Sequence, residues 1–123
     1  MRLRHLGLLV ADQARSQRFY ANYFGFDPAT ATRYPDGTII IRDGEGFDLA
    51  LHAADEPVSV PPFLHFGFQL DAPEPVRALH ALLSGDGYRI VEYEDEPGMV
   101  SFKCLDPDGY PVETYWEPRT DLD

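Results

Sequence analysis

The feature that most constrains this chain is an internal repeat whose two copies lie about sixty residues apart. The sequence His5-Leu-Gly-Leu corresponds to His65-Phe-Gly-Phe, and each copy continues as a short apolar run that ends in an aspartate, Asp12 or Asp71. A duplicated sequence predicts a duplicated fold, so each half is expected to form the same set of helices and strands.

A helical pattern follows each of these aspartates. Large apolar side chains recur at helical spacing over residues 15–24 and again over residues 75–83. The expected helix boundaries are the N-caps Asp12 and Asp71 and the terminating glycines Gly25 and Gly85. Pro73 and Pro75 suit the first turn of the second helix, where a missing N–H group costs little.

Strand-like runs separated by turn dipeptides complete each half. Asp36-Gly37, Asp43-Gly44 and Pro97-Gly98 are typical turn pairs. The predicted strands cover residues 38–42 and 47–52 in the first half and residues 88–93, 100–105 and 110–116 in the second. Each half is therefore predicted to be a β-α-β-β-β module, which places the chain in the α+β class.

The two modules are expected to form a single domain, because 123 residues match the usual size of one globular domain. Residues 53–62 contain three prolines and no periodicity, so they are interpreted as a connection. The predicted boundaries are a module at 1–54, a linker at 55–62 and a module at 63–118. The chain after Pro118 is expected to fray.

The charge balance limits the partners. Ten Lys and Arg stand against 21 Asp and Glu, which gives a formal net charge of −11. Such a charge repels phosphate backbones and anionic lipid surfaces, so it argues against nucleic acid and membrane partners. The same field attracts cationic small molecules or metal ions, although acidity is also a common means of keeping a protein in solution.

Compartment and redox chemistry follow from two further observations. No stretch approaches the roughly 20 apolar residues needed to span a bilayer, and residues 1–10 become polar too quickly for a signal peptide. A cytoplasmic location is therefore expected. The single cysteine, Cys104, allows neither an intramolecular disulfide nor a Cys-based zinc site within the chain, and is interpreted as a packed thiol in a strand.

Alternation along the strands indicates where the polar side chains point. His5 and His65 each lie opposite an entirely apolar side of their strand, and Glu113 likewise avoids the apolar side of the last strand. If the two modules pair about a pseudo-twofold axis, these three side chains converge. Two neutral imidazoles and a carboxylate can bind one divalent ion and leave coordination positions open for water or substrate.

Four segments carry a family resemblance: residues 5–12 (HLGLLVAD), residues 18–26 (RFYANYFGF), residues 65–68 (HFGF) and residues 106–113 (DPDGYPVE). Together they resemble the vicinal-oxygen-chelate superfamily, which includes glyoxalases, extradiol dioxygenases, fosfomycin-modifying enzymes and bleomycin resistance proteins. The resemblance covers nearly the whole chain. It implies two βαβββ modules in a curved eight-stranded mixed sheet with a central cup and the helices outside, often as a homodimer.

The resemblance also implies a metal site. His5, His65 and Glu113 are the expected ligands, and many members add a fourth from the last strand of the first module. The repeat places that fourth position at Ala50, which cannot ligate. The remaining set of two His and one carboxylate resembles the facial triads favoured by iron(II), and manganese, nickel or zinc also fit.

Further polar residues on these strands are candidates for the same site. His52 is a candidate substitute ligand or acid–base catalyst, and Glu113 is a candidate catalytic base as well as a ligand. The candidate substrate-binding residues are Asp48, Gln69, Lys103, Tyr115 and Arg42, each of which could instead be ordinary surface. Leu9 stands where lactoylglutathione lyases of the family carry a basic residue, which argues against glutathione chemistry.

Two functions from different classes fit these features. The first is a metal-dependent enzyme, an isomerase, lyase or dioxygenase that grips vicinal oxygens of a small molecule through the ion. The second is a metal-free, bleomycin-type resistance protein that binds a cationic drug in an acidic groove. The complete set of ligands favours the enzyme, and the net charge of −11 fits the binding protein.

Overall fold

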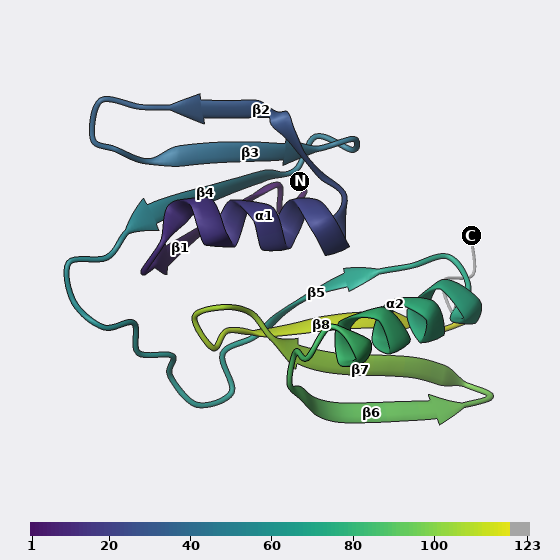
Figure 1. Ribbon diagram of the computed structural model, residues 1–123. Helices are drawn as coiled ribbons and strands as arrows, with labels where there is room; N and C mark the ends of the chain where they lie inside the picture. Colours follow the sequence, from purple (N-terminus) through teal and green to yellow (C-terminus); the bar gives the residue numbers. More distant parts are fainter. Residues whose placement is uncertain (119–123) are drawn as a thin grey trace. The chain divides into compact units, whose positions relative to one another are not determined.

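The computed structural model describes residues 1–118 and divides into two compact units, Met1–Ser59 and Val60–Asp123 (Figure 1). The predicted linker, residues 55–62, contains no helix or strand. The expectation that the chain frays after Pro118 lies outside the described residues.

Unit 1 is a four-stranded sheet with one helix. Its elements are β1 (His5–Val10), α1 (Gln13–Phe24), β2 (Phe26–Arg33), β3 (Ile39–Asp43) and β4 (Asp48–Ala53). The strand order is β1-β4-β3-β2, in which β1 runs parallel to β4 and the other pairs are antiparallel. The first and last strands of the unit are therefore neighbours, with His5 beside Asp48.

Unit 2 repeats this arrangement. Its elements are β5 (Phe66–Gln69), α2 (Pro73–Gly85), β6 (Ile90–Glu96), β7 (Met99–Leu105) and β8 (Pro111–Trp116). The order β5-β8-β7-β6 matches that of unit 1 strand for strand, again with a parallel first pair. The prediction of two βαβββ modules in the α+β class is confirmed.

The two helices begin differently. Asp12 caps α1 as predicted, because its carboxylate accepts the backbone N–H of Arg15 at 3.0 Å, and Gly25 ends the helix at φ 76°. The prediction that Asp71 caps α2 is wrong, since Ala72 holds the N-cap position and makes no side-chain hydrogen bond. Pro73 and Pro75 lie in the first turn of α2, as predicted.

The end of α2 and one strand also differ from prediction. Gly85 is the last helical residue, and Asp86 takes the C-cap position that we expected of Gly85. The strand β2 lies outside every strand predicted in the first half. Its residues are mostly exposed and its pairing with β3 shifts register between Asp27 and Thr32, so it lacks the apolar alternation that identifies a strand.

The repeat extends to the turns that close the final hairpin of each unit. The carboxylate of Asp43 accepts the backbone N–H groups of Glu45 and Phe47 at 2.9 and 2.8 Å. Its counterpart Asp106 accepts those of Asp108 and Tyr110, both at 2.9 Å. The matched glycines, Gly46 and Gly109, adopt φ of 82° and 91°, a conformation that a residue with a Cβ rarely takes.

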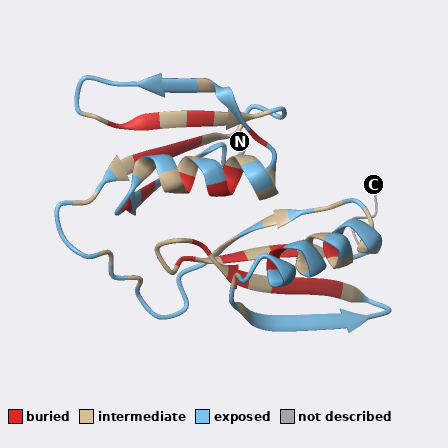
Figure 2. Cartoon of the chain, viewed as in Figure 1, coloured by how far each residue is buried: buried red, intermediate tan, exposed pale blue. Residues whose placement is uncertain are grey.

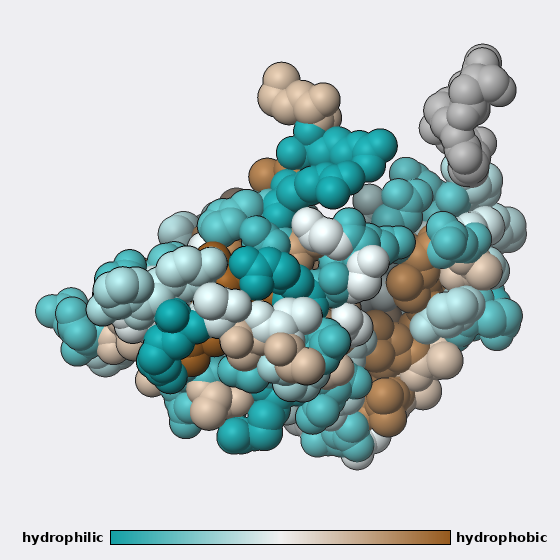
Figure 3. Space-filling view, turned by 90° about the horizontal axis from the view of Figure 1, so that it is seen from above, coloured by the Kyte–Doolittle hydropathy of each residue, from teal (hydrophilic) through white to brown (hydrophobic). Residues whose placement is uncertain are grey.

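Each sheet buries the side that faces its helix, and the burial is deepest in the inner strands, β4 and β3 of unit 1 and β8 and β7 of unit 2 (Figure 2). Fully buried core residues include Phe19, Ile41 and Leu51 in unit 1 and Val76, Phe102 and Val112 in unit 2. The outer strands β2 and β6 are largely exposed. Most of the face seen in Figure 3 is hydrophilic, in keeping with a chain in which 25% of the residues are charged.

Cys104 lies in this core, as predicted for a packed thiol. It is fully buried in β7, and burial raises the pKa of its thiol to about 12. The thiolate, which is the reactive form, is therefore strongly disfavoured.

No helix among residues 1–118 has the length and apolar character needed to cross a membrane.

Candidate functional site

The candidate residues gather on the face of each sheet that points away from its helix, which we call the helix-free face. In unit 1 this face carries His5, Gly7, Arg42, Asp48, Ala50 and His52. In unit 2 it carries His65, Gly67, Lys103, Glu113 and Tyr115. Burial alternates along β1 as predicted, with Leu8 and Val10 buried on the other side.

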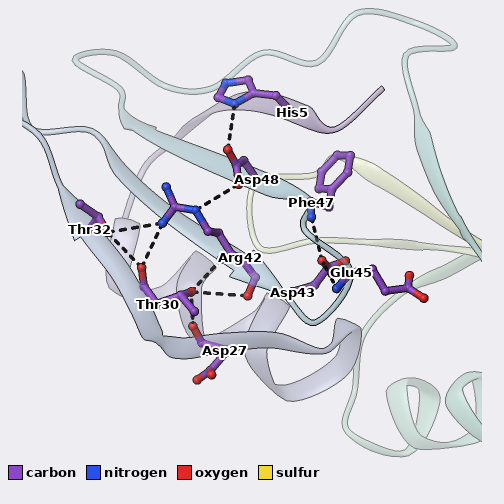
Figure 4. Close-up of polar contacts among 9 residues, drawn as sticks. All are labelled: His5, Asp27, Thr30, Thr32, Arg42, Asp43, Glu45, Phe47 and Asp48. Carbon is purple, nitrogen blue, oxygen red and sulfur yellow. Dashed lines mark hydrogen bonds and ion pairs between the residues drawn. The ribbon is translucent and has the colours of Figure 1, made fainter. Parts of the chain in front are cut away.

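In unit 1 an acidic side chain links a histidine to an arginine (Figure 4). One carboxylate oxygen of Asp48 lies 4.0 Å from His5 Nδ1, and the other lies 3.2 Å from Arg42 Nε. The Arg42 guanidinium also lies 3.4 Å from the Thr30 carbonyl oxygen and from the Thr32 hydroxyl on β2. Asp48 and Arg42 are thus engaged within the unit, and Asp48 presents its charge to the Nδ1 side of the His5 ring.

His52 lies further along β4 and has a different partner. Its Nδ1 lies 2.9 Å from the hydroxyl oxygen of Thr38, a residue that is only 7% exposed. Its Nε2 lies above Gly7, where it would be 3.1 Å from a Cβ built on that glycine. The absence of a side chain at Gly7 therefore makes the room that the His52 ring occupies.

In unit 2 the two predicted ligands share one face of the β5–β8 pair. His65 directly precedes β5, and Gly67 is the register partner of Glu113. A Cβ on Gly67 would come within 3.1 Å of Glu113 Cβ, so Glu113 projects over the glycine, two residues from His65. The Nδ1 of His65 is bonded to the carbonyl oxygen of Phe63 at 2.9 Å.

The remaining candidates in unit 2 surround Glu113. Lys103 is its partner across the β7–β8 ladder and forms an ion pair with Glu92 at 2.8 Å. Tyr115 is paired with Gln69, and its ring edge also approaches Gly67. Lys103 therefore lies between the strand positions of two carboxylates, Glu92 and Glu113. Gln69 is exposed, and nothing in its surroundings indicates a role in binding.

The strand register supports the repeat alignment, which placed the position of a fourth ligand at Ala50. Ala50 pairs with Gly7 as Glu113 pairs with Gly67, so the two residues are equivalent. Ala50 is 1% exposed and its methyl group offers no donor atom. The nearest ionisable side chains on the same strand, Asp48 and His52, engage Arg42 and Thr38 instead.

The donor chemistry of the three predicted ligands fits a divalent ion. The His65 ring has Nδ1 held by a carbonyl oxygen, and the His5 ring has Nδ1 beside a carboxylate. The hydrogen bond to the carbonyl oxygen fixes the His65 ring with its proton on Nδ1 and leaves Nε2 as the free ligand atom, and the carboxylate beside His5 favours the same arrangement there. Within each unit, considering residues 1–118, no three His, Cys, Asp or Glu side chains form a complete metal site.

Three residues near His52 were missed by the sequence reasoning. Gln13, Asp36 and Thr38 contact or flank this ring, yet none was a candidate. Asp36 was interpreted only as a turn residue. The one available signal was the position of Thr38 at the start of a predicted strand, which says nothing about which side chain its hydroxyl meets.

Comparisons with known proteins agree with this fold. Residues 2–114 match the family model described as the Glyoxalase/Bleomycin resistance protein/Dioxygenase superfamily. The chain therefore belongs to that superfamily.

Individual relatives extend the comparison. A trivalent organoarsenical cleaving enzyme from Bacillus sp. (strain MD1) is 29% identical over 98% of this chain and 76% of its own length. The structure of a possible glyoxalase from Bacillus cereus is 28% identical, with a TM-score of 0.77 over 93% of this chain and 97% of that one. The fosfomycin resistance protein FosX from Listeria monocytogenes shares the fold, at 17% identity and a TM-score of 0.78 over 96% and 94% of the two chains.

Proposed function

We propose that this protein is a divalent-metal-dependent enzyme acting on a small molecule that binds through oxygen atoms, with an isomerase, lyase or dioxygenase outcome. His5, His65 and Glu113 are the proposed ligands, and iron, manganese, nickel or zinc the proposed ions. When bound, such an ion supplies Lewis acidity to the chelated oxygens. Membership of the superfamily and the donor chemistry of the three residues support this proposal.

One observation carries the proposal: Nδ1 of His65 is hydrogen-bonded to the Phe63 carbonyl oxygen at 2.9 Å. The Nδ1 of His5 lies 4.0 Å from the Asp48 carboxylate, which puts an acceptor on the same side of that ring. Surface histidines have no need of such a partner, whereas metal-binding histidines almost always have one because it fixes the ring and its tautomer. Glu113 supplies the negative charge that two neutral imidazoles lack.

The arsenical substrate of the Bacillus sp. relative is a poor match for this chain. Trivalent arsenic is a soft centre that prefers thiolate ligands. Cys104 is the only thiol in the chain, it is fully buried, and its pKa is raised to about 12 by burial. We therefore propose a substrate with hard oxygen donors rather than one captured by sulfur.

The alternative function, a metal-free protein that binds a cationic drug, is favoured by one feature. Glu92 and Glu94 are exposed on β6, and Glu92 reaches Lys103 on the helix-free face of unit 2. Together with a net charge of −11, these carboxylates would attract a cation. A binding protein of this kind gains nothing from the oriented imidazoles, so we prefer the enzyme.

Metal analysis of the purified protein tests the choice. We expect about one divalent ion per chain after loading with iron, manganese, nickel or zinc, and its loss in His5→Ala and in Glu113→Ala. His80→Gln is the matched control, because His80 stacks on Tyr93 at 4.0 Å on the other side of the unit 2 sheet. Absence of uptake at micromolar metal, together with calorimetric binding of a bleomycin-like cation, would establish the alternative.

Two further proposals accompany the enzyme. A cytoplasmic location is proposed from the acidic, cysteine-poor composition. A homodimer is proposed from the habit of the superfamily. A monomeric mass in light scattering at micromolar concentration would remove the dimer without affecting the metal site.

A further inference from the structure

His52 is an imidazole that the proposed metal set does not use, and it lies at one end of a chain of hydrogen bonds. Its Nδ1 is 2.9 Å from the Thr38 hydroxyl oxygen. Asp36 in turn accepts the backbone N–H of Thr38 at 2.9 Å, and this contact brings its carboxylate close to the Thr38 side chain. A carboxylate, a hydroxyl and an imidazole are thus linked in series within unit 1.

The order of this series fixes the tautomer of His52. A threonine hydroxyl has one proton to donate, and the Asp36 carboxylate can only accept. We assign the hydroxyl proton to Asp36, whose carboxylate lies beside it, so that the oxygen of Thr38 accepts from His52 Nδ1–H. The neutral ring therefore carries its proton on Nδ1 and a free lone pair on Nε2.

The backbone beside this series is clamped. The Gln13 side-chain amide at the start of α1 donates to the carbonyl oxygens of Gly37 and Leu51 at 2.7 and 2.8 Å. These carbonyls belong to the residues directly before Thr38 and His52. One amide therefore ties the helix to the backbone on both sides of the hydrogen bond, directly before Thr38 and directly before His52.

The free nitrogen points toward the proposed metal-binding end of the face. His52 Nε2 lies above Gly7, and Gly7 is two residues from His5 on β1. At the rise of a β-strand this places Gly7 about 7 Å from His5 along the strand. A small molecule held beside His5 is therefore within reach of the lone pair on Nε2.

We propose that His52 is the general base of the reaction and that Thr38 and Asp36 are its positioning residues, an inference that rests on the proposed function. Nε2 takes a proton from a C–H or O–H group of the chelated substrate. The new N–H bond forms as that bond breaks, and its electron pair stays on the substrate as an enolate or alkoxide. The imidazolium later returns the proton to the product. Glu113 then serves as a ligand only.

The carboxylate at the far end stabilises the protonated ring. The backbone and hydroxyl hydrogen bonds from Thr38, and the charge of His52, hold the pKa of Asp36 below its usual value. Asp36 therefore remains negative throughout the proton transfer. On this face Asp48 and Arg42 are paired with each other, and Asp27 accepts the backbone N–H of Ala29, so Asp36 is the counter-ion linked to His52.

The tautomer can be tested on the full chain without metal or substrate. Nitrogen-15 NMR of the imidazoles should show His52 with a protonated Nδ1 and an unprotonated Nε2, assigned through His52→Gln in a chain with four histidines. We expect Thr38→Val and Asp36→Ala to shift His52 toward the Nε2–H form that free imidazole prefers in water. Thr38→Ser should restore the native form, and Thr32→Val, which removes a hydroxyl near Arg42, should change nothing. An Nε2–H tautomer in the native protein would overturn the assignment.

Proton transfer can be tested with a substrate mimic. Acetohydroxamic acid chelates metal through two oxygens and loses one proton on binding. Calorimetry of its binding to the zinc-loaded chain, in buffers of different ionisation enthalpy, counts the protons released. We expect His52→Gln to release about one more proton per ligand than the native chain, because the native chain keeps that proton on Nε2. Equal proton release would overturn the role of His52 as base.

The two experiments separate this inference from the proposed function. A chain that binds no metal but keeps the Nδ1–H tautomer would remove the metal-dependent reaction and leave the hydrogen-bonded base standing. A chain that binds metal but shows the Nε2–H tautomer, or equal proton release, would retain the metal site and remove the base.

Discussion

The two units place different chemistry on the same backbone. In unit 2 a glycine on the first strand, Gly67, makes room for the carboxylate of Glu113. In unit 1 the equivalent glycine, Gly7, makes room for the imidazole of His52, while the position equivalent to Glu113 is the inert Ala50. The repeat therefore preserves the space above the first strand and varies what fills it.

The side chains around His52 in unit 1 and around Glu113 in unit 2 also differ. In unit 1 the ionisable side chains on this face contact a hydroxyl and a guanidinium group, since His52 meets Thr38 and Asp48 meets Arg42. Unit 2 brings Lys103 between Glu92 and Glu113. Under the proposed function the two units have different tasks: unit 2 supplies the anionic ligand Glu113, and unit 1 supplies the base His52 and the carboxylate beside His5.

The largest effect is expected on metal affinity, where Glu113 as a ligand and Asp48 as the partner of a ligand should differ. Glu113→Gln removes a proposed ligand and should weaken metal binding by about 100-fold or more, whereas Asp48→Asn removes only the partner of a ligand and should weaken it by about 10-fold. Isothermal titration with zinc measures both. Glu92→Gln, which removes a carboxylate of the same face, is the control and should leave the affinity within about twofold.

Equal losses in Glu113→Gln and Asp48→Asn would contradict these different tasks, because the two carboxylates would then be equivalent ligands.

A smaller effect distinguishes the two glycines. An alanine at Gly67 would meet the Cβ of Glu113 at 3.1 Å and its backbone carbonyl oxygen at 3.2 Å, atoms that cannot move without the strand. An alanine at Gly7 would meet only the end of the His52 side chain, which can rotate away. We expect Gly67→Ala to lower the free energy of unfolding by about 1–3 kcal/mol and Gly7→Ala by less than about 1 kcal/mol, measured by urea denaturation.

The reverse order would mean that the His52 ring is held more rigidly than the β8 backbone, and would point to the Thr38 hydrogen bond as a main stabilising contact of unit 1.

The smallest effect concerns pH. Hydrogen bonds from the Arg77 side chain hold the pKa of Asp95 below its ordinary 3.8 in unit 2, as those from Thr38 do for Asp36 in unit 1. A carboxyl group with a lowered pKa stabilises the folded state above its unfolded pKa, and this contribution is lost as the pH falls through the folded value. Asp95→Asn and Asp36→Asn should each lower Tm slightly at pH 7, and the difference from the native chain should shrink below about pH 4.

Thermal unfolding followed by circular dichroism between pH 3 and pH 7 measures this difference. A Tm difference that stays constant over that range would show that the lost contacts act through packing and not through charge.

Much of the fold could be predicted from the sequence because it depends on local signals that occur twice. The cap at Asp12, the terminating Gly25 and the turn at Asp43 depend on residues a few positions away, so the pattern contains what determines them. The cap predicted at Asp71 failed because α2 begins one residue later than the repeat implies, which leaves Ala72 at the N-cap position. The strand β2 was missed because exposed strands with a register shift carry little apolar alternation.

For the site, the sequence could predict only which side of a strand each side chain occupies, because side chains alternate between the two sides. Which side of a strand His5 or Glu113 occupies follows from counting residues along it. The contact between His52 and Thr38 joins residues on two strands, and it depends on their register and on the rotation of the ring. Neither the register nor the ring rotation can be inferred from the neighbouring residues, so the series from Asp36 to His52 was found only in the structure.

The carboxylate turn shared by the two units also bears on the order in which each unit folds. Asp43 and Asp106 close hairpins whose first paired residues, Arg42 with Asp48 in unit 1, are close neighbours in sequence. The parallel pair of His5 with Asp48 spans about 40 residues instead, and closing that longer loop costs about 2 kcal/mol more chain entropy. We therefore expect the antiparallel hairpins to form first, and the strands β1 and β5, which begin at or directly after the proposed imidazole ligands, to dock last.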